Sequence, residues 1–442
     1  MENISFKEAL RFWFKLGLIS FGGPAGQIAV MHKELVEERK WVSEGRFMHA
    51  LNYCMMLPGP EAQQLATYMG WLMHKTRGGI AAGVLFILPS LLLLIALSGV
   101  YMAWGKVAAV AGIFYGMKAA VAAVVAHATH RIGQRVLHNT WLWVIASLSF
   151  LGLLVFNLPF PLIIVGAALA GYVGDKYYPE EFYEDTMRAK DESAPEEDEP
   201  TPEHARFDLR RVLTIFGVGI ALWAGALGLL ALATGGWSGL LAQMALFFTK
   251  AALLTFGGAY AVLPYVYQHA VGHAHWLSTA QMMDGLALGE TTPGPLIMVV
   301  AFIGFVAGWT RHVFGTESLF LAGAAGACVA TFFTFLPSFL FILGGGPLVE
   351  ATRGKMRFTA PLTAITAAVT GVIANLTVFF ALHLLWPRTG GETMLWGFDW
   401  IAALLAGAAA WMLFKLRYGM IRVILFCGAP GLVLKLAHII PA

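Results

Sequence analysis

The residues best suited to chemistry lie at helix-breaking motifs that each occur twice. Phe-Gly-Gly stands at residues 21–23 and 256–258, and Pro-Gly-Pro at residues 58–60 and 293–295. Glycine lets the main chain approach a ligand closely, and proline removes an amide donor, so a regular helix is interrupted at these motifs. A helix that restarts after a break directs free amides and a partial positive charge into the gap, which suits an oxyanion. The alternative is that the glycines only allow close helix packing and the prolines only kink helices.

The four motifs belong to a long internal repeat. An offset of 235 residues aligns both Phe-Gly-Gly motifs and both Pro-Gly-Pro motifs without a gap, and from Pro89 to Thr129 the offset becomes 248. The 13-residue difference is an insertion between the two aligned blocks. Self-similarity over this length predicts two duplicated halves rather than a solenoid of short repeats.

Two lysines and two hydroxyl residues precede the Phe-Gly-Gly motifs at matching positions. Lys15 and Lys250 each lie seven residues before the double glycine, and Ser20 and Thr255 stand at equivalent sites between them. We expect the lysines to compensate the charge of an anion and the hydroxyls to donate hydrogen bonds to it. The alternatives are that the lysines extend to the membrane surface and that the hydroxyls bond to their own helix backbone.

The acidic residues near the motifs are not symmetric. Glu61 directly follows the first Pro-Gly-Pro motif, whereas Glu290 precedes the second one by three residues, and Asp284 lies further upstream. Carboxylates within a membrane are costly and indicate function, here pairing with a lysine or accepting a proton that is coupled to transport. Glu61 has a second interpretation, as a cap for the helix that starts at Pro60. His127 aligns with a second polar residue under the 248 offset and is a candidate proton relay.

Other titratable residues carry less information. Lys118 has no charged counterpart in the second half, and we expect it to extend toward the membrane surface. His269, His273 and His275 lack acid or thiol partners nearby in the sequence, so we expect no metal site there. The chain has no motif typical of a nucleophilic, metal-dependent or nucleotide-dependent enzyme.

Composition places these motifs in a membrane. The 442 residues are 58% hydrophobic and 12% charged, with a mean hydropathy of +0.69, and runs such as 80–101 and 209–234 are long enough to cross a bilayer as helices. Because the runs are continuous rather than alternating, we predict an all-α polytopic membrane protein. Residues 175–203 hold 12 acidic and 3 basic side chains, so the rest of the chain carries a net charge of +12, which suits anionic lipid or an anionic solute.

The predicted organisation follows from these patterns. We expect an N-terminal repeat at 1–174, an acidic flexible linker at 175–208, a spacer transmembrane helix at 209–234 and a C-terminal repeat at 239–442. If each half crosses the membrane an even number of times, the single spacer helix turns the second half upside down. The halves are then inverted repeats with short, broken helices, a plan that holds substrate near the middle of the membrane.

The motifs also carry a family resemblance. The blocks SFGGPAGQIAVMHKELVEE, LNYCMMLPGPEAQQLATYMGW and TFGGAYAVLPYV resemble the chromate ion transporter family in its long, two-domain form, over residues 5–174 and 239–437. The resemblance implies oppositely oriented halves and export of chromate across the bacterial inner membrane, driven by the membrane potential or by protons. It also implies a multi-pass protein of the bacterial inner membrane that confers chromate resistance.

We therefore predict a secondary active transporter that holds chromate, a tetrahedral dianion, between its halves. We expect its partners to be the oxyanion, the lipid bilayer and protons as coupling ion, with a homodimer left open and with no cofactor, metal or nucleic acid. The alternatives are sulfate or another tetrahedral oxyanion as cargo, a channel, or a membrane-embedded enzyme. The predicted proton-coupling residues are Glu61, Glu290, Asp284 and His127. The predicted substrate-binding residues are Lys15, Ser20, Gly22, Gly23, Asn52, Pro58, Gly59, Pro60, Gln63, Gln64, Lys250, Thr255, Gly257, Gly258, Thr291, Thr292, Pro293, Gly294 and Pro295.

Overall fold

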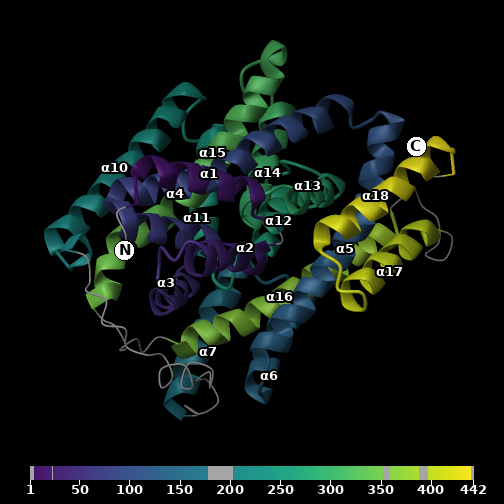
Figure 1. Cartoon of the computed structure of the whole chain (residues 1–442). Coiled ribbons are helices and arrows are strands. Elements are labelled where there is room, and N and C mark those ends of the chain that lie inside the picture. The colour runs from purple at the N-terminus through teal and green to yellow at the C-terminus, as the bar shows by residue number, and fades with distance from the viewer. Residues whose placement is uncertain (1–3, 22, 178–202, 352–358, 388–396, 440–442) are drawn as a thin grey trace.

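The chain folds into helices, as its composition predicts. The computed structural model describes residues 4–21, 23–177, 203–351, 359–387 and 397–439. Every regular element in these ranges is a helix (Figure 1). Five of these helices are long and apolar enough to cross a membrane. The prediction of an all-α polytopic membrane protein is therefore confirmed.

The first half begins with short helices and continues with longer ones. The predicted interruptions near residues 21 and 58 both separate helices. Gly22 itself lies outside the described residues, as do residues 178–202, which make up most of the predicted acidic linker. The helices of this half are α1 (Phe6–Ile19), α2 (Gly23–His32) with the π-helical η1 (Lys33–Glu38), α3 (Glu44–Met56), α4 (Glu61–Trp104), α5 (Ala108–Val136), α6 (Thr140–Leu154) and α7 (Phe160–Tyr177).

The second half repeats this order after one additional helix. A short 3-10 turn, η2 (Glu203–Ala205), leads into that helix, α10 (Leu209–Ala233), which exposes most of its apolar side chains at the edge of the molecule. The remaining helices are α11 (Leu240–Leu253), α12 (Ala259–Tyr267) with η3 (Gln268–His273), α13 (Thr279–Thr291), η4 (Leu296–Met298), α14 (Val299–Thr310), η5 (Thr316–Ser318), α15 (Leu319–Ala351), α16 (Thr359–Leu385), α17 (Trp400–Phe414) and α18 (Met420–Leu436).

Local sequence explains where several helices begin. Ser278 and Gln281 form a reciprocal capping box at the start of α13, with hydrogen bonds of 3.2 and 2.8 Å to each other's backbone amides. Asn139 caps α6 and Asp399 caps α17 with one hydrogen bond each, accepted from the amide three residues on. These polar residues satisfy amides that have no partner within their own helix.

Helix α4 is two helices that fold back on each other. The backbone leaves the helical region at His74 and Lys75, where Lys75 has a φ of 57°. Gly70 lies against Gly78 with no room for a Cβ atom, so the segments on either side of the turn pack closely. In the second half, α14 and α15 form the equivalent pair, and Gly304 lies against Gly326 in the same way.

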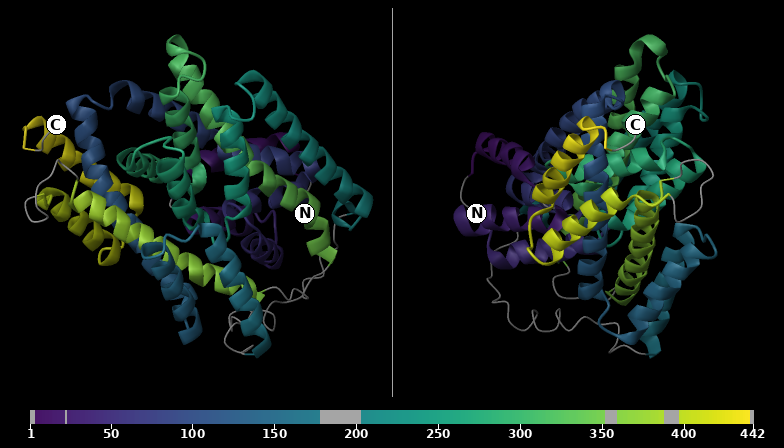
Figure 2. Two further views of the ribbon diagram at one scale, coloured as in Figure 1. Left: turned by 180° about the vertical axis from the view of Figure 1, so that it is seen from behind. Right: turned by 90° about the vertical axis from the view of Figure 1, so that its right-hand side faces the viewer.

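The two halves interlock through their last two helices. Helices α6 and α7 pack on α16 of the second half, and α17 and α18 pack on α5 of the first half (Figure 2). Helices α5 and α16 also contact each other. The hydroxyls of Thr129 and Thr377, which are equivalent under the 248 offset, lie 2.9 Å apart at their crossing. Each half is therefore completed by helices from the other.

The apolar core is divided unequally between the halves. One cluster of buried side chains joins α1, α2 and α3 to the first part of α4, with Trp13, Phe47 and Trp71 at its centre. A larger cluster contains α5, α16 and the whole set α11 to α14. The short helices of the second half are thus buried with α5 and α16, whereas those of the first half share a smaller cluster with α4 and with Ile342 and Leu343 of α15.

Candidate functional site

The helix breaks meet as two crossed pairs. The amide of Gly59, in the first Pro-Gly-Pro motif, donates a hydrogen bond of 2.7 Å to the carbonyl of Thr255, just before the second Phe-Gly-Gly motif. The amide of Gly294, in the second Pro-Gly-Pro motif, donates one of 2.8 Å to the carbonyl of Ser20, just before the first Phe-Gly-Gly motif. The breaks of each half are therefore held by the breaks of the other half.

Glycine is required at both Pro-Gly-Pro motifs for two physical reasons. Gly59 has a φ of 127° and Gly294 a φ of 103°, a region that residues with side chains rarely occupy. Both glycines also lie against a serine of the opposite half: a Cβ at Gly294 would stand 2.8 Å from the Cβ of Ser90, and Gly59 faces the hydroxyl of Ser338 in the equivalent contact. The close approach of main chain to main chain expected from the motifs is present.

Polar side chains of the first half surround these contacts. Gln27 is 1% exposed, and its amide group donates to the carbonyls of Ser20 and Gly294, so it ties the second crossed pair together. Gln64 donates to the carbonyl of Pro58 at 2.8 Å and reaches the hydroxyl of Ser338 at 3.4 Å. Apolar residues occupy the positions equivalent to Gln27, Gln63 and Gln64 in the second half, so these amide side chains come from the first half only.

Several buried polar atoms near the breaks have no hydrogen-bond partner among the described residues. Buried polar groups in proteins are almost always hydrogen-bonded, so such a cluster indicates a site for water or for a polar ligand. Serine hydroxyls donate to oxyanions, whereas the glutamine oxygens accept, because the amide nitrogens of these residues already donate to carbonyls or to the hydroxyl of Thr67. The atoms are Ser20 Oγ, Ser90 Oγ, Gln27 Oε1, Gln63 Oε1 and Gln64 Oε1.

The predicted acidic residues Glu61 and Glu290 both lie near the second Phe-Gly-Gly motif. Glu61 begins α4, and its Oε1 stands 3.8 Å from the position that a Cβ at Gly258 would occupy, so it faces the second Phe-Gly-Gly motif. Glu290 is buried in the last turn of α13 and accepts a hydrogen bond from the hydroxyl of Tyr260. Both carboxyls are therefore placed within the broken-helix region, each from a different half.

Asp284 is paired with Lys118, which the sequence did not predict. Lys118 Nζ lies 3.4 Å from Asp284 Oδ1, and the hydroxyl of Tyr101 donates to Asp284 Oδ2 at 2.9 Å. The side chain of Asp284 is 4% exposed and that of Lys118 is 26% exposed. The expectation that Lys118 extends toward the membrane surface is wrong, because a carboxylate in α13 holds its charge inside the molecule.

The two matched lysines lie on exposed faces of their helices. Lys15 Nζ contacts Glu34 Oε1 at 3.4 Å, and the lysine side chain is 58% exposed. Glu34 also accepts from Arg39 Nε at 3.2 Å, so it is shared between two cations. Lys250 is likewise exposed, in the last turn of α11. The role of both lysines in substrate binding stays a prediction.

The remaining predicted residues have varied surroundings. Thr255 is buried and donates to its own helix at the carbonyl of Ala251, 2.7 Å away, so its hydroxyl follows the alternative interpretation. Thr291 and Thr292 also donate to carbonyls one turn back in their own helix. Asn52 is exposed on α3, and the ring of His127 packs edge-on against Phe414.

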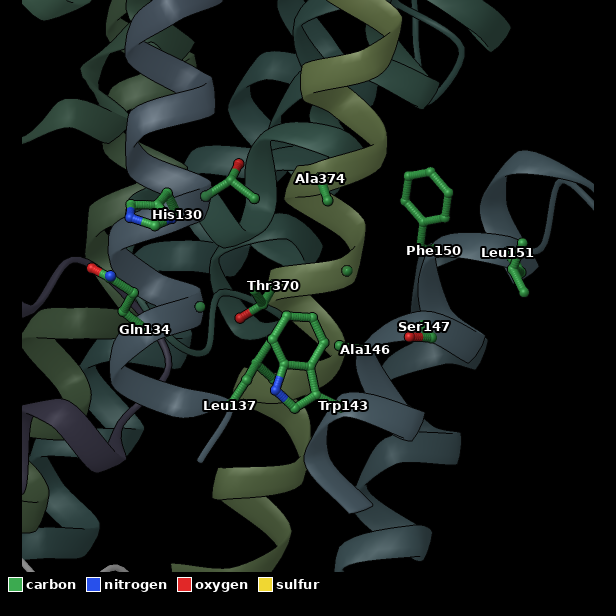
Figure 3. A pocket seen from close by; sticks show the side chains of 13 residues that line it. His130, Gln134, Leu137, Trp143, Ala146, Ser147, Phe150, Leu151, Thr370 and Ala374 are labelled. Atoms are coloured by element: carbon green, nitrogen blue, oxygen red, sulfur yellow. The ribbon is translucent and has the colours of Figure 1, made fainter. Parts of the chain in front are cut away.

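A cavity of about 730 Å³ lies between α5, α6 and α16, away from the breaks (Figure 3). Trp143, Leu137 and Phe150 supply apolar walls, while His130 and Gln134 stand on the α5 side. None of the predicted substrate-binding residues lines it. Because a small dianion needs several hydrogen-bond donors or cations, this apolar cavity is a poor match for the predicted substrate.

Sequence reasoning missed two residues that the fold brings to the breaks, Ser90 and Gln27, and a third, Tyr101, that donates to Asp284 of α13. Ser90 served only to align the halves, Gln27 was not singled out, and Tyr101 lies at the end of a long apolar run. A weak signal existed for Ser90, because a Pro-Ser pair recurs at residues 337–338 in the other half. No local pattern indicated which polar residues would meet across the halves.

Comparisons with known proteins place the chain among transporters. The family described as chromate transporter matches residues 7–172 and 242–432. A chromate transport protein of Pseudomonas aeruginosa is 32% identical, over 97% of this chain and 92% of its own. A probable chromate transport protein of Synechococcus elongatus is 30% identical over 85% of this chain and 84% of its own, and a chromate transport protein of Cupriavidus metallidurans is 27% identical over 85% and 83%. No solved structure matches the chain significantly.

Proposed function

The chain belongs to the chromate transporter family, and we propose that it exports chromate across the bacterial inner membrane and thereby confers chromate resistance. Our assignment of the substrate-binding site rests on one observation, the pair of crossed hydrogen bonds from Gly59 to Thr255 and from Gly294 to Ser20. They join helix ends of the two halves in two pairs, and the unpartnered hydroxyls of Ser20 and Ser90 belong to the residues that contact Gly294. Irregular backbone at membrane depth is tolerated where it lines a polar cavity or is buried in protein.

Chromate is held by hydrogen-bond donors at this junction. The hydroxyls of Ser20 and Ser90 stand on either side of Gly294 and donate to the chromate oxygens. The amide group of Gln63, in the first turn of α4, keeps a second N–H beside its bond to Thr67 and adds a neutral donor, while Gln64 holds the carbonyl of Pro58. The N-terminal end of that helix supplies a partial positive charge. The positive charges of Lys15 and Lys250 balance the negative charge of the dianion along its path.

The halves are inverted repeats related by a two-fold axis in the membrane plane. The reciprocal contacts support this relation, since α6 and α7 pack on α16 just as α17 and α18 pack on α5. A two-fold axis through the contact of Thr129 with Thr377 accounts for a pair of equivalent residues touching each other. In Figure 1, α5 descends from the upper right while α16 rises from the lower left, as oppositely oriented helices do. Two such halves present the same site alternately to each side of the membrane.

Buried carboxyls link this transport to protons. Glu61 and Glu290 face the broken-helix region from different halves, and Asp284 forms an ion pair within the protein. A carboxyl that exchanges a proton as the dianion passes couples the two movements, because it changes the charge of the site at that moment. His127 is the candidate relay between these carboxyls and the surface.

The site is tested with the two serine hydroxyls. In proteoliposomes loaded with labelled chromate, Ser20→Ala and Ser90→Ala should each raise the KM for chromate about tenfold or more, because a hydrogen bond to a charged group contributes roughly 1.5–3 kcal/mol. The carbonyl of Ser20, not its hydroxyl, holds Gly294, so the alanine variant keeps the crossed hydrogen bond. Ser149→Ala is the matched control, since this buried serine donates to its own helix in α6 and should transport as the wild type does.

The same vesicles separate the alternatives of cargo and mechanism. If transport is coupled to protons, an imposed pH gradient should accelerate chromate movement. If it is coupled to the membrane potential, an imposed potential should do so. Unlabelled sulfate should compete if the site recognises tetrahedral dianions in general. Equal KM values in the serine variants and the wild type would remove the junction as the binding site.

A further inference from the structure

The ion pair of Lys118 and Asp284 connects the two halves inside the membrane region. Lys118 lies in α5 of the first half, Asp284 in α13 of the second half, and Tyr101, at the end of α4, donates to the same carboxylate. Removing two charges from water costs about as much as their attraction returns, so a buried pair is weak evidence for a role in stability. Charged residues within a membrane are instead candidates for function.

The halves differ in how their short helices contact the two central helices, α5 and α16. In the second half, α12 packs on α16 and α13 packs on α5 and α18. In the first half, α2 and α3 make no comparable contact with α5 or α16 among the described residues, and they belong to a separate apolar cluster. We call α11 to α13 the second-half unit and α1 to α3 the first-half unit. Helices α12 and α13 are docked on α5 and α16, whereas, within the described ranges, α2 and α3 are not, and α11 and α1 are held alike, on α15 and α4.

Sequence equivalence predicts what Lys118 would meet if the first-half unit docked instead. The counterpart of Lys118 under the 248 offset is Thr366 in α16, whose side chain packs beside Gly257 at the α11–α12 junction. The same relation in the first half places Lys118 beside the junction of α1 and α2, close to Ser20. The residue equivalent to Asp284 is His49, and in that arrangement His49 would face Thr366.

The exchange leaves a lysine without its carboxylate. When the second-half unit moves away, Lys118 loses its contact with Asp284. The junction of α1 and α2 then offers hydroxyl and amide groups to Lys118, and the residue equivalent to Asp284 in the first half is His49 rather than an acid. An unpaired ammonium within a membrane is unstable unless an anion accompanies it. A tetrahedral dianion at the junction supplies that anion and has the donors of Ser20 beside it.

We propose that Lys118 is a substrate-binding residue that exchanges Asp284 for the transported dianion when the first-half unit docks on α5. The inference rests on the proposed function and adds to it the cation that the serine and glutamine donors lack. Asp284 is then the counter-ion that keeps the lysine charged and in place between transport events. Tyr101 positions the carboxylate for this role through its hydrogen bond.

Equilibrium binding of labelled chromate, and separately of labelled sulfate, to the purified full-length protein in detergent tests the proposal. Lys118→Met leaves Asp284 unpaired and risks misfolding, so the decisive variant is Lys118→Met with Asp284→Asn, which removes both charges together. We expect its Kd for the dianion to rise at least tenfold. Asp284→Asn alone should lower the Kd, because the competing carboxylate charge is gone. Lys106→Met, an exposed lysine in the turn before α5, is the matched control and should leave the Kd unchanged.

The possible results separate the proposed function from the role of Lys118 in substrate binding. If the wild type binds a dianion and the double variant binds it with a Kd within twofold, Lys118 is not a substrate-binding residue, although the proposed function stands. If the wild type binds neither chromate nor sulfate, both the proposed function and this inference fail. Retention of binding in Lys118→Arg, with loss in the double variant, is the pattern that a charge contact with the substrate requires.

Discussion

Replacing Gly294 by alanine tests the crossed arrangement of the breaks directly. Gly294 has a φ of 103°, its amide donates to the carbonyl of Ser20, and an added Cβ would stand 2.8 Å from the Cβ of Ser90. Alanine must therefore either adopt a strained backbone against Ser90 or withdraw from the contact and lose the hydrogen bond. Both responses disturb the same junction, so the effect on stability and the effect on transport should appear together.

The expected magnitude follows from these two contributions. If the backbone stays in place, its strain costs about 1–3 kcal/mol, and if it withdraws, loss of the hydrogen bond costs about 0.5–1.5 kcal/mol, so destabilisation of roughly 0.5–3 kcal/mol is expected. Adding Ser90→Gly removes the atom that the new Cβ meets but not the strained φ. The two substitutions should therefore couple by about 0.5–1.5 kcal/mol in a double-mutant cycle.

The assay is unfolding of the purified protein in detergent, followed by tryptophan fluorescence, together with chromate transport in proteoliposomes. Gly225→Ala in α10 is the control, because Gly225 is exposed, helical and free of neighbours within 4 Å. That substitution should be neutral or stabilise the protein by about 0.5–1 kcal/mol. If Gly294→Ala unfolds at the wild-type temperature and transports chromate normally, the close contact of Gly294 with Ser20 and Ser90 is refuted.

Three further predictions follow from the proposed mechanism. Lys15→Met or Lys250→Met should abolish chromate efflux and resistance without lowering the amount of protein in the membrane, and unchanged efflux in either variant would remove that lysine from the mechanism. Glu290→Gln should leave exchange of chromate for chromate intact but abolish acceleration by an imposed pH gradient, measured in the same vesicles; persistence of that acceleration would exclude Glu290 as the coupling group. In a variant whose native cysteines are replaced, cysteines at His49 and Thr366 should form a disulfide more readily when chromate is present, as judged by mobility on a gel, and equal cross-linking with and without substrate would argue against docking of the first-half unit.

Much of the fold was accessible from the sequence because it depends on local patterns. Continuous apolar runs predicted helices that cross a membrane, and the Gly and Pro motifs predicted where those helices stop. The structure has α1 ending before Phe-Gly-Gly and α3 ending before Pro-Gly-Pro, as expected. The turn inside α4 at His74 and Lys75 lies before the apolar run 80–101, which was expected to cross the bilayer as a helix.

The candidate site was only partly accessible, because its contacts join residues far apart in the chain. The glycine motifs and Glu61 were identified by type and position, but Gln27 and Ser90 are ordinary polar residues until they meet Gly294. Lys118 was misjudged for the same reason, since its partner lies 166 residues away in α13.

The sequence by itself determined that this is an all-helical membrane protein with a duplicated plan, four breaks and a surplus of basic residues in its body. Periodicity, hydropathy and backbone preference are properties of neighbouring residues, so they can be read along the chain. The tertiary structure alone decided that each Pro-Gly-Pro motif meets the Phe-Gly-Gly motif of the other half, and that Lys118 pairs with Asp284. Those partners depend on how α5 and α16 cross and on which unit of short helices is docked, and no local preference specifies either.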